Sequence, residues 1–218
     1  MSDGQTMTGT DLRVDPRFQR SHDALAAVML RLAAERPAEQ ISVHELAREA
    51  GVSRQTFYRH SPSPVDFLAE LLVAELAPLD EDLIVAAQDP DVRFSDAWRA
   101  FYLAALDQVA SRETTYRVIV GERSAVFDAL LSFFESSAAH FIRAVSVNPP
   151  DDVWIKLASQ QQAGNIAAII RTWVLTGMTM DPEDLVDRFM SLAPPWQLAH
   201  RGPSGTVDLQ DVRAGRRS

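Results

Sequence analysis

Residues 43–64, VHELAREAGVSRQTFYRHSPSP, predict the fold of the N-terminal part of the chain. Ser42 precedes the stretch and has a glutamate three residues further on, which is the pattern of a helix capping box. Gly51 can adopt the positive φ that a tight turn requires. Ser53 is a second N-cap residue, followed by a short segment rich in polar side chains. The pattern indicates two short helices joined at a glycine, a helix-turn-helix.

The charged residues are divided unevenly along the chain. The 218 residues have a formal net charge of −9. Residues 13–64 hold eight arginines against six carboxylates, a balance of +2, whereas residues 65–195 hold nine basic and twenty acidic residues, a balance of −11. A local basic excess matters more for contact with a polyanion than the net charge of the whole protein. The N-terminal quarter is therefore the part suited to nucleic acid.

Composition excludes several classes of site and of protein. The chain has no cysteine, which excludes disulfides, cysteine-ligated metals and thiol catalysis. The first sixteen residues lack the apolar stretch of a signal peptide. The most apolar segment, residues 166–175, is interrupted by Arg171 and is too short to span a bilayer. These features predict a soluble, cytoplasmic protein that does not enter a membrane.

Helical periodicity continues through almost the whole chain after Asp15. A first helix is expected to begin at Pro16 and end at Pro37, and a long helix to run from Ser63 to Pro78. Further helices are expected at roughly 80–87, 92–111, 114–120, 124–145, 152–177 and 182–192. The predicted fold class is all-α, with an N-terminal helix-turn-helix domain (15–62) and a helical ligand-binding and dimerisation domain (63–195). Residues 1–14 and 196–218 are expected to be a disordered arm and a disordered tail.

The second helix of a helix-turn-helix enters the major groove of double-stranded DNA, while the first crosses the backbone. Leu46, Ala50 and Phe57 are expected to pack the two short helices against another helix of the domain. The other side chains of 53–60 are then expected to point outward. Arginine and glutamine can make bidentate contacts with base edges, and the neighbouring donors suit phosphates. The alternative is an amphipathic pair whose polar face only meets water. The expected DNA-binding residues are Ser42, Val43, Ser53, Arg54, Gln55, Thr56, Tyr58, Arg59 and His60.

Residues 15–72 resemble the DNA-binding domain of TetR/AcrR-type bacterial repressors. The resemblance rests on ISVHELAREAGVSRQTFYRHSPSPVDFLAELL, which follows the helix DPRFQRSHDALAAVMLRLAAERP. It implies a homodimer that binds a palindromic operator and is released by a small-molecule inducer bound in a helical C-terminal domain. Two positions depart from the family pattern: Ser61 stands where an aromatic residue is usual, and Pro64 where a lysine is usual.

The segment AAIIRTWVLTGMTMDPEDLVDRFMSL resembles the last two helices of the same family, through which its members dimerise. Its apolar residues at helical spacing form more surface than one helix pair of a small domain easily covers. A second copy of the chain is therefore the expected partner, with packing inside the monomer as the alternative. The expected interface residues are Ile166, Ile169, Ile170, Trp173, Leu185, Phe189 and Leu192.

Three consecutive glutamines, 160–162, precede the apolar half of one predicted helix. Because successive helical residues diverge by ~100°, at least one of them should face inward. A buried amide needs a hydrogen-bond partner, which a ligand or a bound water could supply. The expected pocket residues are Trp98, Tyr102, His140, Gln161 and Asn165.

Sequence signatures of catalysis are absent. The chain has no G-x-S-x-G, no phosphate-binding glycine loop and no H-E-x-x-H, and its five histidines lack metal-ligand spacing. We therefore expect no enzymatic activity, cofactor or metal. Two alternatives stay open: a helical ligand- or partner-binding dimer that has lost operator binding, and, more remotely, a small helical enzyme.

Overall fold

The computed structural model describes residues 15–121, 124–146, 148–199 and 209. The regular elements assigned within these ranges are helices, which confirms the all-α prediction. The predicted N-terminal arm, 1–14, lies outside the described residues. The elements are α1 (Pro16–Ala33), η1 (Ala38–Gln40), α2 (Val43–Glu49), α3 (Arg54–Tyr58), α4 (Pro64–Gln88), α5 (Phe94–Ser111), α6 (Glu113–Ile119), α7 (Ala125–Val145), α8 (Asp152–Leu175), α9 (Pro182–Met190) and η2 (Pro195–Leu198).

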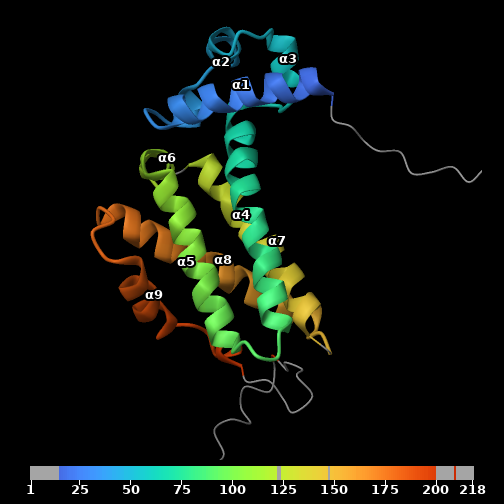
Figure 1. Cartoon of the computed structure of the whole chain (residues 1–218), viewed down its shortest axis with the longest axis vertical. Helices are drawn as coiled ribbons and strands as arrows, with labels where there is room; N and C mark the ends of the chain where they lie inside the picture. The colour runs from blue at the N-terminus through green and yellow to red at the C-terminus, as the bar shows by residue number, and fades with distance from the viewer. Residues whose placement is uncertain (1–14, 122–123, 147, 200–208, 210–218) are drawn as a thin grey trace, which may run out of the picture.

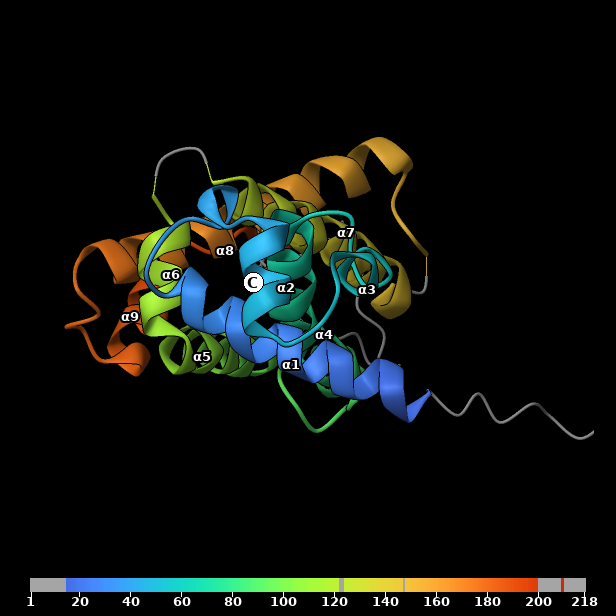
Figure 2. The same cartoon turned by 90° about the horizontal axis from the view of Figure 1, so that it is seen from above.

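The helices form two parts that share one long helix (Figure 1). Helices α1 to α3 gather at one end of α4, and α1 packs against α2 and α4. From there α4 runs into the second part, where it packs against α5 and α7, and α7 in turn packs against α8. Figure 1 shows α2 and α3 at the upper end of α4 and α9 in the lower half of the molecule, and the view from above shows α2 lying over α4 (Figure 2). Helix α4 is thus the main covalent and packed connection between the two parts.

Side-chain caps explain why most helices begin within two residues of the predicted starts. In seven helices an oxygen of the preceding Ser or Asp accepts a hydrogen bond from a first-turn backbone N–H, which stabilises a helix start by about 0.5–2 kcal/mol. Only half of the predicted capping box forms in α2, because Glu45 pairs with Arg36 instead of returning to the cap. The capping residues are Asp15, Ser42, Ser53, Ser63, Ser124, Asp151 and Asp181.

The predicted break at Pro78 is wrong, because α4 continues through it to Gln88 and absorbs the separate helix expected at 80–87. Proline inside a helix removes one backbone hydrogen bond and costs about 3 kcal/mol. Apolar side chains on both sides of the proline, Leu76 and Leu83, are buried in the common core. The packing of α4 against α5 and α7 therefore outweighs the local preference of one residue.

Helix α7 is long and apolar enough, by length and composition alone, to cross a membrane. In the structure it packs against α4 and α8, and Phe127, Phe134 and Phe141 are among its buried side chains. Burial in the core of the second part accounts for this composition.

The ordered chain extends further than the predicted boundary at residue 196. Pro195–Leu198 forms the short helix η2, in which Trp196 and Gln197 are buried, and Ala199 and Leu209 are buried as well. The prediction of a disordered tail rested on the composition of residues 196–218, which are rich in glycine, serine and arginine. A few individual residues in this segment are nevertheless buried, and composition does not reveal them. The rest of the predicted tail lies outside the described residues.

Candidate nucleic-acid interface

The turn between α2 and α3 is a hydrogen-bonded reversal centred on Gly51. The N–H of Val52 bonds to the carbonyl of Ala47 at 2.9 Å, and the N–H of Gly51 bonds to that of Arg48 at 3.2 Å. This pair of bonds is the Schellman motif, whose central residue takes the left-handed conformation. Gly51 has φ +68°, and a Cβ built on it would meet nothing within 4 Å. The glycine is therefore required by backbone conformation and not by crowding.

Replacing Gly51 with alanine is expected to destabilise the protein by about 1–2 kcal/mol, because a side chain strains the left-handed backbone. Gly51→Asn should cost less, since asparagine tolerates this conformation better than alanine. Urea unfolding of the three proteins would measure the difference. Equal losses for the two variants would contradict a conformational origin.

The two short helices are held by apolar side chains directed at α1 and α4. Phe57 on α3 and Leu46 on α2 have 0% exposed surface. The ring of Phe57 meets that of Phe67 at 5.9 Å in an edge-to-face contact, and Phe67 lies on the first turns of α4. The N-terminal core therefore extends past the predicted domain boundary at residue 62, because α4 contributes to it.

The opposite side of α3 faces solvent. Arg54 and Gln55 are exposed, and within the described residues no hydrogen bond or ion pair of their side chains is found. Tyr58 has 59% of its surface exposed, and Arg59 is exposed with its guanidinium 5.9 Å from the ring centre of Phe18. Helix α3 thus presents the guanidinium of Arg54, the amide of Gln55 and the hydroxyl of Tyr58 to solvent.

The predicted contacts near the helix starts have mixed environments. Ser42 and Ser53 are exposed, and both are engaged as N-caps. Thr56 is half-buried, with its hydroxyl 2.9 Å from that of Ser53. Val43 is also half-buried and packs against the core. These residues shape the ends of α2 and α3 and offer hydroxyls and backbone N–H groups near the outward face.

From the sequence we expected His60 to point outward with the rest of the segment. The structure instead directs it toward α1. Its Nε2 lies 2.8 Å from the hydroxyl of Ser21, and its ring lies 4.0 Å from the ring of Phe18. Since the Ser21 hydroxyl donates to the carbonyl of Phe18, the imidazole Nε2–H is the donor to Ser21. His60 follows the last turn of α3, where the chain turns back toward α1, and this reversal aims it inward.

Burial lowers the pKa of His60, and the neighbouring His22 and Arg59 lower it further. Its Nδ1 is buried and has no partner among the described residues, so a proton there would have no acceptor. The folded pKa of His60 is therefore below its unfolded value of 6.5. The resulting contribution to stability is complete above pH 6.5 and is lost as the pH falls through the folded pKa.

We therefore expect the unfolding free energy to fall as pH decreases below 6.5, and to fall less in His60→Gln, whose amide can still donate to Ser21. Urea unfolding at several pH values would measure both slopes. Identical slopes in the two proteins would assign the acid sensitivity to other groups.

The two positions that depart from the family pattern have clear structural roles. Ser61 is buried, and its hydroxyl is 3.3 Å from the carbonyl of Ser63 and 3.5 Å from a carboxylate oxygen of Glu70. Pro64 is the first residue of α4, where a missing N–H costs little. A polar contact therefore fills the place of the aromatic residue, and no cation stands at the start of α4.

The predicted pocket residues do not form one site. Trp98 and Tyr102 are buried beside each other, and Asn165 is half-buried with its Nδ2 unpaired among the described residues. His140 and Gln161 are exposed, so the structure does not bring them together with the buried Trp98 and Tyr102. The inward glutamine is Gln162, which hydrogen-bonds to Tyr102.

Helical spacing could have identified this glutamine. Gln162 lies four residues before Ile166 and seven before Ile169, both buried on the same face of α8, whereas Gln161 is turned by ~100° from that face. The predicted dimer residues Ile166, Ile169, Ile170, Trp173 and Leu185 are likewise buried inside the single chain, and Phe189 is half-buried with its ring 4.8 Å from that of Tyr102. Among these residues only Leu192 is exposed, so the apolar face of α8 belongs to the monomer core.

The exposed side of α8 carries a different apolar row that we had not predicted. At ~100° per residue its five members fall within a stripe of roughly 60°, on the side opposite the buried isoleucines. Gly164 in this row has open space around its Cα, since an added Cβ would meet nothing within 4 Å. We call these residues the outer α8 stripe: Val153, Leu157, Gly164, Ala168 and Leu175.

Comparisons with known proteins agree with this geometry. The family model described as bacterial regulatory proteins, tetR family, matches residues 26–71, from α1 into α4. A TetR transcriptional regulator from Streptococcus agalactiae has 19% identity, with 81% of this chain and 94% of that chain covered and a TM-score of 0.56.

Two further solved structures have the same fold. A TetR-family regulator from Streptomyces coelicolor has 15% identity, covering 83% of this chain and 96% of that chain, with a TM-score of 0.56. FadR from Bacillus subtilis, in complex with stearoyl-CoA, has 17% identity over 80% and 96% of the two chains, with a TM-score of 0.52. Residues 26–71, which include the helix-turn-helix, therefore match the tetR family of bacterial regulatory proteins in sequence, and the solved structures show that the chain shares the fold of such regulators.

Proposed function

We propose that this regulator is a homodimeric repressor that binds a palindromic operator through α3 and is released by a small molecule bound in its second part. The observation that carries the proposal is the outward face of α3, where Arg54, Gln55 and Tyr58 are exposed while Phe57 between them is fully buried. A helix seated in this way presents base-reading side chains in a constant orientation.

The two kinds of contact follow from the side chains. Arg54 can donate two hydrogen bonds to the O6 and N7 of guanine, and Gln55 can pair with the N6 and N7 of adenine. Tyr58 and Arg59 suit phosphate oxygens, which position the protein without reading sequence. Two copies related by a two-fold axis would place their α3 helices in successive major grooves, about 34 Å apart.

The outer α8 stripe supports a dimer. It combines large exposed side chains, Leu157 at 64% and Leu175 at 70%, with Gly164 and Ala168, which permit close approach of a second helix. The opposite side of α8 is already packed inside the chain, so this stripe is the side of α8 that can pack against a second copy. A two-fold dimer would bring the same stripe of both copies together, because such an interface uses one surface patch twice. This stripe replaces the interface residues expected from the sequence.

Leu157→Glu is therefore expected to convert the dimer to a monomer at micromolar concentration and to reduce operator affinity. Val85→Glu is the matched control, since Val85 is 68% exposed on α4 and lies outside the stripe. Sedimentation velocity would measure the state of each protein. A dimer that survives Leu157→Glu, or that is lost equally in Val85→Glu, would contradict the proposed interface.

Two connections could carry a signal from the second part to α3. Helix α4 contributes to both cores, and the carboxylate of Glu39 in η1 accepts a hydrogen bond from the backbone N–H of Ala125, the first residue of α7, at 3.0 Å. A ligand that prefers one arrangement of these helices would shift the spacing of the two α3 helices of the dimer.

Fluorescence anisotropy of labelled DNA from upstream of the chain's own gene tests the proposal. We expect tight binding that scrambled DNA does not displace and that weakens steeply with salt, because phosphate contacts release counterions. Equal binding to specific and scrambled DNA, repeated with wider genomic fragments, would overturn it. That result would favour a dimer without operator binding, for which the absence of a cation at Pro64 is the supporting observation.

A further inference from the structure

A small polar cluster lies inside the aromatic core of the second part. The hydroxyl of Tyr102 on α5 is 3.0 Å from Nε2 of Gln162 on α8 and 3.2 Å from Nε2 of Gln197 in η2. Gln197 also hydrogen-bonds to Oε1 of Gln162. All three side chains are buried, and burial raises the pKa of Tyr102, so its hydroxyl stays protonated. The three members come from elements 35 to 95 residues apart in sequence.

Two hydrogen-bond donors beside this cluster are unused. Trp98 and Trp196 are 1% and 5% exposed, and the indole N–H of each has no acceptor among the described residues. Their rings meet edge to face at 5.6 Å. A buried donor without a partner is costly, typically about 1–3 kcal/mol. The region thus contains two buried donors that have no acceptor among the described residues.

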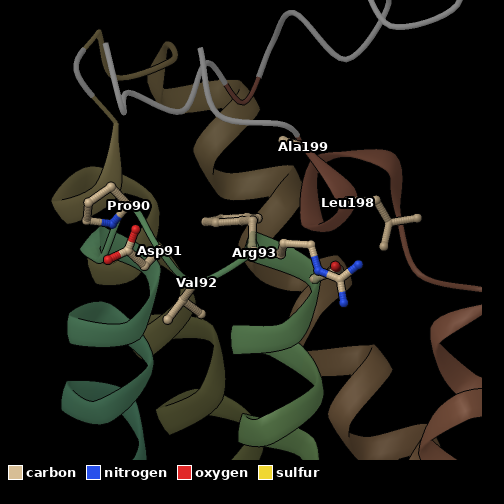
Figure 3. Close-up of a pocket in the computed structure, with 8 residues that line it drawn as sticks. Pro90, Asp91, Val92, Arg93, Leu198 and Ala199 are labelled. Atoms are coloured by element: carbon tan, nitrogen blue, oxygen red, sulfur yellow. The ribbon is translucent and has the colours of Figure 1, made fainter. Parts of the chain in front are cut away.

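Trp196 and Gln197 belong to a short segment that follows the last α-helix. They lie in η2, which follows α9 after four residues and packs against α5. The next residues, Leu198 and Ala199, form one side of a surface cavity of about 310 Å³, and residues 90–95 form the other side (Figure 3).

Neighbouring residues of one segment therefore belong to both places, because Gln197 is part of the buried cluster and Leu198 and Ala199 line the cavity. Phe94, which lines the cavity, has its ring 6.5 Å from that of Trp98. If η2 moved away from α5, Leu198 would leave the cavity wall and the Trp196 ring would leave its contact with Trp98.

We propose that Trp196 and Gln197 occupy a ligand site from within the chain, and that a planar aromatic molecule with a hydrogen-bond acceptor on its edge displaces them. The aromatic ring of the ligand takes the place of the Trp196 indole against Trp98. The acceptor receives the N–H of Trp98, which has none at present, while Tyr102 and Gln162 remain paired with each other.

The acceptor is the feature that selects the ligand. An aromatic hydrocarbon would fill the space but would leave the Trp98 N–H unpaired, as it is now. Displacing η2 costs free energy. The apparent affinity for the ligand is therefore the intrinsic affinity multiplied by the fraction of molecules in which the site is open. This assignment deepens the proposed function, since it identifies the inducer class and the element that an inducer would move.

The indole N–H signals of ¹⁵N-labelled protein test the proposal, with quinoline as the probe and naphthalene as its isostere without an acceptor. Quinoline should move the Trp98 signal downfield, as a new hydrogen bond does, and should move the Trp196 signal toward that of a solvent-exposed indole. Trp173 is the internal control, because its N–H already donates to the carbonyl of Met180 at 2.9 Å. The single variants Trp98→Phe and Trp196→Phe assign the signals.

Trp196→Ala removes the internal occupant and should bind quinoline at least roughly tenfold more tightly than the wild type, with naphthalene binding more weakly than quinoline to both. If quinoline binds the variant and leaves wild-type Trp98 and Trp196 unmoved at a concentration that saturates the variant, the segment is fixed core and the proposal is wrong. Equal affinity for quinoline and naphthalene would overturn the role of the Trp98 N–H.

The wild-type titration gives a result even if Trp196→Ala does not fold. DNA is not involved in any of these measurements. Quinoline binding in a protein without operator affinity would therefore reject the proposed function and keep the ligand site, and the reverse result would reject the site alone.

Discussion

Phe57→Ala is expected to destabilise the N-terminal domain by about 3–5 kcal/mol, the usual cost of removing a fully buried phenylalanine. The ring has no exposed surface and packs on Phe67, so its loss leaves a cavity where α3 meets α4. This loss is a large part of the roughly 5–15 kcal/mol that stabilises a typical domain. Operator binding should be lost with it, because α3 alone has only five residues and cannot persist without packing.

The adjacent residue supplies the matched control. Tyr58 is 59% exposed, so Tyr58→Ala should change the unfolding free energy by no more than about 0.5 kcal/mol. Urea unfolding followed by circular dichroism would measure stability, and anisotropy would measure DNA affinity. We expect Phe57→Ala to lose stability and Tyr58→Ala to lose affinity only. A stable Phe57→Ala protein would contradict the seating of α3 described above.

Arg54→Ala is expected to weaken operator binding by about 1–3 kcal/mol, or roughly five- to 150-fold, since a bidentate contact to guanine has this value. The fold should not change, because none of the described residues is paired with the Arg54 side chain. Anisotropy against operator and scrambled DNA would separate loss of base reading from loss of general affinity. Discrimination between the two DNAs should decrease.

Arg54→Lys is the control for charge. It keeps the positive charge but loses the planar pair of donors, so it should retain affinity for scrambled DNA and still discriminate poorly. A lysine variant that discriminates as well as the wild type would mean that Arg54 contacts phosphate. Unchanged operator affinity in Arg54→Ala would remove this residue from the interface.

The sequence by itself determined the fold class, the helix starts and the helix-turn-helix. These features depend on neighbours along the chain: a serine oxygen reaches an N–H three residues away, as at Ser42 and Ser53, and Gly51 supplies a local backbone conformation. Helical spacing also required that one of three consecutive glutamines face inward. These interactions join residues only a few positions apart, so they can be predicted from the sequence alone.

Only the tertiary structure decided which face each long helix buries and where α4 ends. The isoleucines of α8 are apolar whether they meet a second copy or their own chain, and the structure places them inside the monomer, which leaves the outer α8 stripe exposed. Pro78 opposes a helix locally, yet packing on both sides carries α4 through it. Gln197 reaches Tyr102 across 95 residues. In each case the free energy comes from contacts between segments distant in sequence, and periodicity along one segment cannot specify its partner.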